Sequence, residues 1–159
     1  MNNQLKKALR ICIGVYLFAG GIVAFFTFVN MMGLDGFLVS LIPGLMCAFF
    51  TIFSTVSGYW LLKGTQKSHF DMGMVALLMQ VIQIIVLGLS FRNYFGPFVA
   101  FGFSDTPEFH LIYDWEIVLY GFFNGLNKSS NEISLVINFF PMVLLVLLEK
   151  CRPVKAGTS

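Results

Sequence analysis

Charged residues are scarce in this chain and are missing from the middle of its long apolar runs. Only 11 % of the residues are charged and 57 % are hydrophobic, whereas a soluble domain carries about 25 % charged residues. A chain with so little polar surface cannot cover an apolar core in water, so the composition predicts a membrane protein. The basic residues lie in short flanks and form no patch, which argues against nucleic-acid binding.

Cysteine and catalytic motifs are scarce or missing as well. The three cysteines, Cys12, Cys47 and Cys151, offer no metal-binding spacing and no pair to staple a loop. The sequence holds no nucleophile elbow, phosphate-binding loop or zinc-protease motif. Its apolar runs also lack the ionisable groups through which proton pumps relay. We therefore expect a protein without catalytic activity, cofactor or metal.

What the chain does have is four apolar runs, each close to the roughly 20 residues that cross a bilayer as a helix. Lipid offers the backbone no hydrogen-bond partners, and unbroken apolar runs satisfy their own backbone best as helices. The predicted fold is an all-α membrane protein, a four-transmembrane-helix bundle in a single domain over residues 1–159. The helices are expected at about residues 9–30, 37–62, 71–91 and 130–150.

The basic residues predict the orientation of this bundle. The chain has 10 Lys and Arg residues, and all except Arg92 and Lys128 flank helix ends on one side. Both termini are therefore expected to be cytoplasmic. The protein would be integral to a plasma membrane or a bacterial inner membrane, with residues 92–129 outside the cytoplasm.

Two local signals concern the fourth run. Ser129 and Glu132 form an S-x-x-E capping box ahead of it. Pro141 lies inside the run, and because proline removes a helical hydrogen bond, we expect a kink there. Asn138, one turn earlier, is placed to bond a carbonyl that the kink would free.

Uncharged polar residues line up on one face of the second and third predicted helices. A short turn makes these helices antiparallel neighbours, so Gly58 is expected to meet Gly73, and Thr51 to meet Gln80. Small and polar side chains at a helix contact allow close approach and hydrogen bonds across it. The candidates for helix packing, or for lining a pathway, are Thr51, Ser54, Gln80, Gln83 and Asn138.

The segment between the last two helices predicts a small extracytoplasmic β-hairpin. Apolar and polar residues alternate from Glu108 to Ile117, which is a strand pattern, and Ser104–Pro107 suits a turn after a first strand. The aromatic face of this hairpin is expected to rest on helix ends or headgroups. A short interfacial helix over residues 115–126 is the alternative for the second half. The candidate outer contacts are Phe109, His110, Tyr113, Asp114, Trp115 and Glu116.

These features favour a multi-spanning membrane interaction or accessory protein without catalytic activity. Its expected partners are the lipid bilayer and either further copies of itself or another membrane protein. The alternative is a homo-oligomeric channel or small-solute pathway lined by the polar faces of the second and third helices. A membrane enzyme using His110, Asp114 and Glu116 is the third hypothesis, although alternate residues on a strand stand about 6.6 Å apart and converge poorly.

Overall fold

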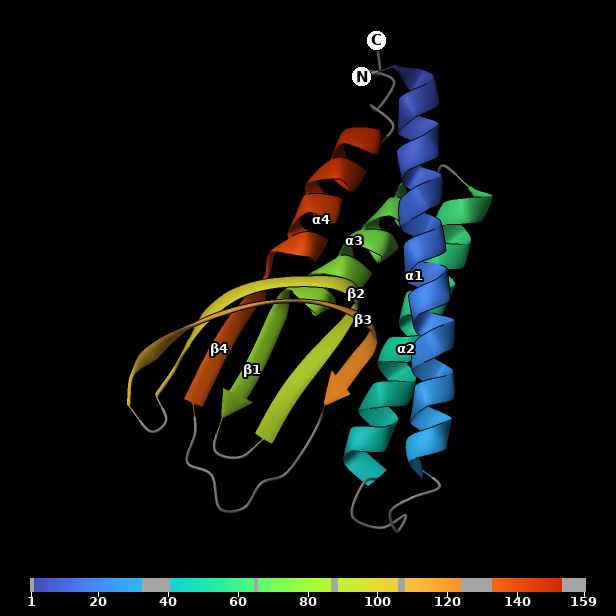
Figure 1. The fold of residues 1–159 in the computed structure, drawn as a ribbon. Helices are drawn as coiled ribbons and strands as arrows, with labels where there is room; N and C mark the ends of the chain where they lie inside the picture. The colour runs from blue at the N-terminus through green and yellow to red at the C-terminus, as the bar shows by residue number, and fades with distance from the viewer. Residues whose placement is uncertain are drawn as a thin grey trace.

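The structure is a computed structural model that describes residues 2–32, 41–64, 66–86, 89–105, 108–123 and 133–152. Within these ranges the chain forms helices at both ends and strands between them (Figure 1). In chain order the elements are α1 (Asn3–Met32), α2 (Leu41–Lys63), α3 (Lys67–Val81), β1 (Ile82–Val86), β2 (Leu89–Ser104), β3 (His110–Phe123), β4 (Ile133–Asn138) and α4 (Phe139–Cys151).

The two longest helices, α1 and α2, run side by side in opposite directions (Figure 1). Their contact is built on glycine. A Cβ on Gly58 would lie 2.7 Å from the carbonyl oxygen of Gly14, and a Cβ on Gly21 would lie 2.7 Å from the backbone nitrogen of Thr55. Small residues therefore set how closely the two backbones approach.

The third and fourth apolar runs each change from helix to strand partway along. The helix α3 ends at Val81 and β1 begins at Ile82, while β4 ends at Asn138 and α4 begins at the next residue. The change follows the distribution of β-branched residues, because β1 reads IQIIV and β4 reads ISLVIN. Such side chains suit the pleated surface of a strand better than a helix.

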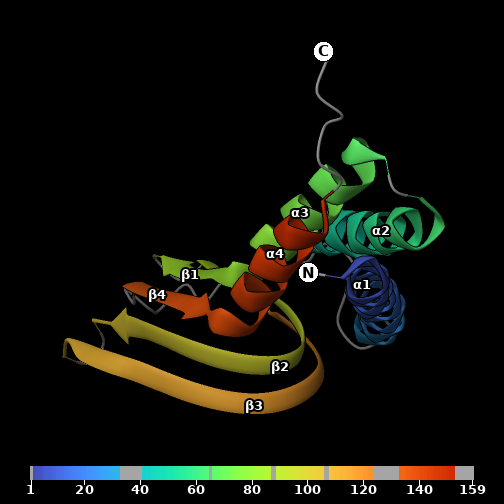
Figure 2. The same ribbon diagram turned by 90° about the horizontal axis from the view of Figure 1, so that it is seen from above.

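The strands form one antiparallel sheet in the order β1-β4-β2-β3, in which the start of β2 also pairs with β1. The register aligns Ile82 with Ile137 between β1 and β4, and Ala100 with Asn138 between β2 and β4. The hairpin of β2 and β3 is strongly curved (Figure 2). Its register shifts between Tyr94 and Gly96, where Gly96 takes a φ of +76° that glycine adopts without strain.

Two buried apolar clusters hold these elements together. The larger lies among the helices and includes Leu17, Leu61, Phe70, Leu77 and Leu148. The smaller lies within the sheet, where Phe98, Ala100 and Val136 are buried and Ile112 packs against them. The strands are thus part of the folded unit and not an appendage on a helical bundle.

The prediction of an all-α, four-transmembrane-helix bundle is therefore wrong. A four-stranded antiparallel sheet accompanies the four helices of the described residues. Only one helical stretch among them, Asn3–Phe26, is long and apolar enough to cross a membrane by length and composition. The apolar runs were misassigned because a short apolar segment has the same composition in a buried strand as in a helix.

The predicted hairpin is confirmed as an antiparallel pair, but it is longer than expected and belongs to the four-stranded sheet. Its register aligns Ser104 with His110 at the turn and Arg92 with Phe123 at the far end. Residues 115–123 are strand, so the interfacial helix is wrong over that range. The remainder of that helix and the capping box of Ser129 and Glu132 lie outside the described residues.

Pro141 does not kink a helix. It lies in the first turn of α4, whose N-cap is Asn138. The first four N–H groups of a helix have no partner within the helix, so a proline in this turn removes nothing.

Candidate functional site

The outer side of the helices is covered by large apolar side chains that no other described residue covers. On α1 and α2 such side chains occur along both helices. Half or more of the accessible surface of Phe26, Leu45, Phe49 and Ile52 is exposed. Helix α4 adds Val143 and Val146 on its own outer side.

The sheet continues this surface with aromatic side chains. Phe101 and Tyr113 lie opposite each other, as do Phe103 and Leu111, so all four project from one face. The exposed fractions of Phe109, Leu111, Tyr113 and Trp115 range from 65 to 72 %. The aromatic residues Phe109, Tyr113 and Trp115 therefore do not rest on the helices, which leaves the headgroups as the remaining alternative of the prediction. We call these exposed side chains of α1, α2, α4 and the sheet the outer apolar surface.

On the opposite face, the residues of β2 from Phe98 onward and those of β4 are buried and mostly small or polar, with Phe98 and Val136 as the large apolar members, whereas His110 and Asp114 of β3 are exposed. Ala100 lies opposite Asn138, Gly102 opposite Val136, and Ser104 opposite Ser134. All six of these residues are buried. Most of the large apolar side chains described in the sheet thus lie on its exposed face, which reverses the arrangement expected in water, where the more apolar face of a sheet is buried.

Polar side chains of the helices also lie inside the molecule, and some of them bond to neighbouring elements. Ser54 Oγ donates to the carbonyl oxygen of Leu17 on α1 at 3.1 Å, and Tyr16 Oη on α1 donates to Oε1 of Gln80 on α3 at 2.8 Å. Thr51 is buried, and its hydroxyl donates to the carbonyl oxygen of Ala48 on its own helix at 2.9 Å.

These contacts correct the predicted pairing of the second and third helices. Gly58 meets α1 rather than Gly73, and Gly73 meets Leu61 and Leu148. Thr51 likewise faces Gly21 of α1, and Gln80 bonds to Tyr16. Of the candidate polar residues, Ser54 and Gln80 make their hydrogen bonds to α1.

The two remaining candidates for helix packing lie in or beside the strands. Gln83 is a buried residue of β1. Asn138 is fully buried, and its Oδ1 accepts hydrogen bonds from Phe140 N at 3.1 Å and from Val99 N at 3.3 Å. Its Nδ2 and the Nε2 of Gln83 are buried without a hydrogen-bond partner in the described structure.

The predicted outer contacts are divided between the two faces of β3. Phe109, Tyr113 and Trp115 belong to the outer apolar surface, whereas His110 and Asp114 are exposed on the other face. The carbonyl oxygen of Glu108 accepts from His110 Nδ1 at 2.8 Å. Glu116 lies opposite Phe98 in the register, and the position of its side chain is outside the description.

No group of three or more metal-ligating side chains comes together among the residues that the structure describes. Along β3, His110 and Asp114 are four residues apart on one strand and do not converge on a common point. The arrangement offers no geometry for shared acid–base or metal chemistry at these two residues.

Charged side chains gather at one end of the molecule, where α1 and α3 begin and α2 and α4 end (Figure 1). We call this the basic end; it carries Lys6, Lys7, Arg10, Lys63, Lys67, Lys150 and Arg152. Arg10 links two elements at this end, and Lys63 makes a contact within α2. Arg10 donates to the carbonyl oxygen of Gly64 after α2. Lys63 Nζ lies 5.4 Å from the ring centroid of Tyr59, a cation–π contact.

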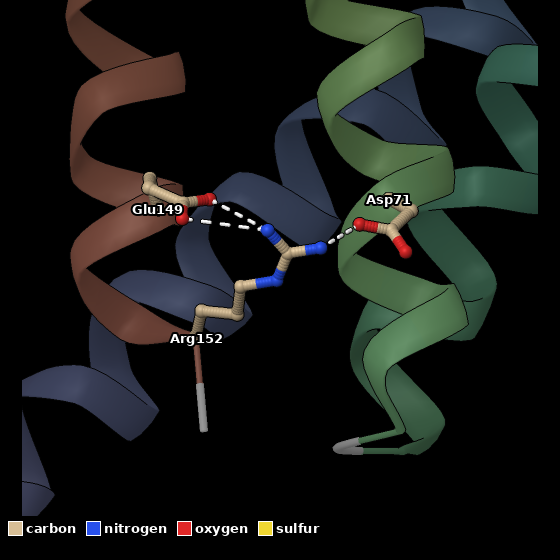
Figure 3. Close-up of polar contacts among 3 residues, drawn as sticks. All are labelled: Asp71, Glu149 and Arg152. Carbon is tan, nitrogen blue, oxygen red and sulfur yellow. Dashed lines mark hydrogen bonds and ion pairs between the residues drawn. The ribbon is translucent and has the colours of Figure 1, made fainter. Parts of the chain in front are cut away.

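Arg152 ties the end of α4 to α3 by ion pairs to two carboxylates (Figure 3). Its Nη2 pairs with Asp71 on α3, and its Nη1 lies 3.3 Å from Oε2 of Glu149 on α4. Beside it, burial raises the pKa of the Cys151 thiol, while the positive charges of Lys6 and Arg10 act to lower it. The basic end is therefore a packed junction of α1, α3 and α4.

An open apolar groove of about 280 Å³ lies between α1 and α2 on the outer apolar surface. It is lined by Ile22, Phe25, Thr51, Ile52, Thr55 and Val56. The hydroxyl of Thr55 donates to the carbonyl oxygen of Thr51, one turn earlier on the same helix, at 2.8 Å. This hydroxyl is thus already hydrogen-bonded, and the groove presents a mainly apolar surface.

Sequence reasoning missed Tyr16 and the pairing of Arg152 with Asp71. A tyrosine in the middle of an apolar run was a signal, because a buried phenol needs a hydrogen-bond partner. Opposite charges flanking two apolar runs on the same predicted side were a signal for the ion pair.

No protein-family model, curated protein or solved structure matches this chain. The function must therefore be argued from the surface and the interior described above.

Proposed function

We propose that this protein is a membrane-embedded interaction protein without catalytic activity, whose outer apolar surface faces lipid chains. The observation that carries the proposal is the reversal in the sheet. Ala100, Ser104 and Asn138 are buried, while Phe101, Tyr113 and Trp115 are exposed. Water penalises this arrangement and hydrocarbon favours it, because apolar area gains nothing from burial when the solvent is itself apolar.

The length of α1 supports the proposal. The stretch Asn3–Phe26 has 24 residues, which at 1.5 Å per residue span about 36 Å, more than the roughly 30 Å of hydrocarbon in a bilayer. By the same measure, α3 and α4 are about 22 and 20 Å long and do not cross it. Helix α2, with 23 residues, is long enough as well, but among the described residues only α1 meets the test of length and apolar composition together, so we assign the crossing to α1, with α2 packed along it.

The basic end supports a direction of insertion. Lysine and arginine accumulate on the cytoplasmic side of membrane proteins, and here the start of α1 and the end of α4 share one end of the molecule (Figure 1). We propose that this end, and with it both termini, is cytoplasmic. The aromatic residues Tyr59 and Trp60 near Lys63 suit the interface between lipid and water.

The chain's two tryptophans give a direct test, because they lie on different elements and are both exposed. The single-tryptophan variants Trp60→Phe and Trp115→Phe would be reconstituted into vesicles whose lipids carry bromine at a known acyl-chain depth. We expect bromine deep in the chains to quench Trp115, and bromine near the headgroups to quench Trp60 more strongly. Aqueous iodide should quench Trp115 little.

Matched vesicles with unbrominated lipid are the control for each variant. If iodide quenched Trp115 as fully as it quenches free tryptophan, and deep bromine left its emission unchanged, the outer apolar surface would not face lipid. The proposed function would then be wrong.

A homo-oligomeric pathway lined by Thr51, Gln80 and Gln83 is the competing function. The hydroxyl of Thr51 and the amide oxygen of Gln80 are engaged within the protein, and this favours packing over a water-filled path. The same vesicles loaded with a small-solute indicator test it: flux that Gln80→Leu and Gln83→Leu abolish would support the pathway and count against the interaction function.

A further inference from the structure

The outermost strand of the sheet, β3, pairs along one edge only. It lies at the end of the order β1-β4-β2-β3 and is hydrogen-bonded to β2. In the part of the chain that the structure describes, no strand pairs with its other edge. The half of β3 that follows the turn lies away from the helices (Figure 2). A row of backbone N–H and C=O groups is thus presented to the surroundings.

This edge conflicts with the surroundings that the proposed function implies, and the inference below rests on that function. Lipid chains cannot bond to backbone groups, so open sheet edges are not left exposed in the hydrocarbon of a membrane. The side chains beside the edge, Phe109, Leu111, Tyr113 and Trp115, are the most exposed of the outer apolar surface. If these side chains face lipid, the backbone groups of the β3 edge beside them lie in lipid too. They then need the backbone of another strand as a hydrogen-bond partner.

The usual protections of a free edge are missing from this half of β3. Natural sheets shield edges with lysine, proline or a bulge. Residues 110–115 read HLIYDW and include neither residue. The register of β3 with β2 is also unbroken from Gly96 opposite Val118 to Ser104 opposite His110. This half of the edge therefore has no bulge, lysine or proline, and its one charged residue is Asp114, so it is open to pairing.

We propose that two copies of this chain associate by antiparallel pairing of β3 with β3 of the second copy, about a two-fold axis at Ile112. A two-fold contact makes each pair of residues occur twice. In this register Leu111 lies opposite Tyr113 of the second copy, and Phe109 lies opposite Trp115. On the other face, His110 lies opposite Asp114 of the second copy.

This register places apolar side chains opposite apolar side chains, and a basic side chain opposite an acidic one. Aromatic and aliphatic side chains that lie directly opposite across antiparallel strands stabilise the pair, as does a basic side chain opposite an acidic one. His110 Nδ1 donates to its own Glu108 carbonyl oxygen, so Nε2 faces the Asp114 carboxylate of the second copy and donates to it when the imidazole is protonated. Pairing would also extend the four-stranded sheet into one of eight strands with a continuous outer apolar surface.

Disulfide crosslinking in vesicles tests both the contact and its register. In a variant with Cys12, Cys47 and Cys151 replaced by serine, Leu111→Cys and Tyr113→Cys would be made separately and co-reconstituted under reducing conditions. Both positions are exposed, so neither change disturbs the core. Mild oxidation of the mixture should give at least about five times more disulfide dimer than either variant alone. Directly opposite Cβ atoms stand about 5 Å apart, whereas diagonal positions about 7–8 Å apart exceed disulfide reach.

A mixture of Leu111→Cys with Val143→Cys is the matched control, because Val143 is equally apolar and exposed but lies on α4. Equal crosslinking in that mixture, or none in the first, would overturn the pairing. Strong crosslinking of Leu111→Cys with itself would overturn the register at Ile112.

The tryptophan measurement separates this inference from the function beneath it. In the same vesicles, made with Trp60→Phe in every chain, deep bromine should quench Trp115. Quenching without a crosslink overturns the β3 pairing and leaves the membrane function standing. Trp115 that deep bromine cannot quench overturns the membrane function whatever the crosslinks show.

Discussion

The hydroxyl of Tyr16 on α1 donates a 2.8 Å hydrogen bond to the side-chain oxygen of Gln80 on α3. The Tyr16 ring also meets Phe140 of α4 edge-on, with centroids 5.6 Å apart, and a Cβ on Gly96 of β2 would lie 3.2 Å from it. One side chain in the middle of α1 thereby contacts two other helices and the bend of the sheet. Tyr16 is the point at which the helices and the sheet are fixed to each other.

Replacing Tyr16 by phenylalanine should destabilise the protein by about 1 kcal/mol, within the range of roughly 0.6–2 kcal/mol for polar bonds between helices in membranes. The ring contacts remain, but the buried oxygen of Gln80 loses its donor. Reversible unfolding in mixed micelles measures the difference. Tyr59→Phe is the control, because Tyr59 is 46 % exposed and its ring keeps the contact with Lys63. An equal loss in both variants would contradict a specific role for the Tyr16 hydroxyl.

The seam between α1 and α2 should tolerate no side chain at Gly58. A methyl group there would overlap the backbone of Phe18 and Gly14, so Gly58→Ala must push the helices apart. Overpacking of this kind costs about 1–3 kcal/mol. Thermal unfolding in micelles checks it.

The control for this change is Ile52→Ala on the exposed side of α2, where the side chain is 59 % exposed. We expect that variant to unfold close to the parent. A Gly58→Ala protein as stable as the parent would show that the two helices do not pack as described.

Loss of the acceptor oxygen of Asn138 should lower the stability of the protein more than a change in the size of this side chain does. Its Oδ1 accepts from the backbone N–H groups of Phe140 and Val99, so Asn138→Ala leaves two partly buried donors without this acceptor. Loss of a helix N-cap costs about 1 kcal/mol, and the second unpaired donor adds to that. Asn138→Ser restores an acceptor for the cap and should recover part of the loss. Equal unfolding free energies for the two variants would argue against capping.

Pro141 distinguishes the observed fold from a long fourth helix in a way that can be measured. In the middle of a helix, proline costs about 3 kcal/mol relative to alanine, so Pro141→Ala would stabilise a continuous helix strongly. In the first turn of α4, proline is well tolerated, and the substitution should change stability by less than about 1 kcal/mol. Denaturant unfolding of Pro141→Ala beside the parent decides between these outcomes.

The sequence predicted the hairpin and the grouping of basic residues but not the sheet. Alternation from Glu108 to Ile117 is a local pattern, and β3 formed there. The pairing of β1 with β4 joins Gln83 to Val136 across more than fifty residues, and no local pattern encodes such a contact. The change from helix to strand at Ile82 was visible only as a cluster of β-branched residues, which a hydropathy pattern does not separate from a helix.

The candidate polar residues were found for the right reason and assigned to the wrong neighbour. Ser54 and Gln80 do bond between elements, as small polar residues in apolar runs are expected to do. The short turn between α2 and α3 suggested that these helices would share their polar faces. Packing instead turned the face of α2 that carries Gly58 toward α1, where Gly14, Gly21 and Gly58 allow close approach, and Gln80 of α3 reaches α1 through Tyr16.

The thiol of Cys151 should make stability depend on pH in the alkaline range. Burial raises its pKa above the ordinary value of 9.0, against the opposing effect of Lys6 and Arg10. A group whose pKa is higher in the folded state binds its proton more tightly there, so its contribution is complete below the unfolded pKa and is lost as pH rises through the folded one. The free energy of unfolding should therefore fall as the pH rises above about 9, and less steeply in Cys151→Ala.

Lys6→Gln removes a charge that favours the thiolate, and it should move alkylation of Cys151 by a small maleimide to higher pH than in the parent. A Cys151 that reacts at the pH of an ordinary thiol, unmoved by Lys6→Gln, would contradict the burial of this residue at the junction of α1 and α4.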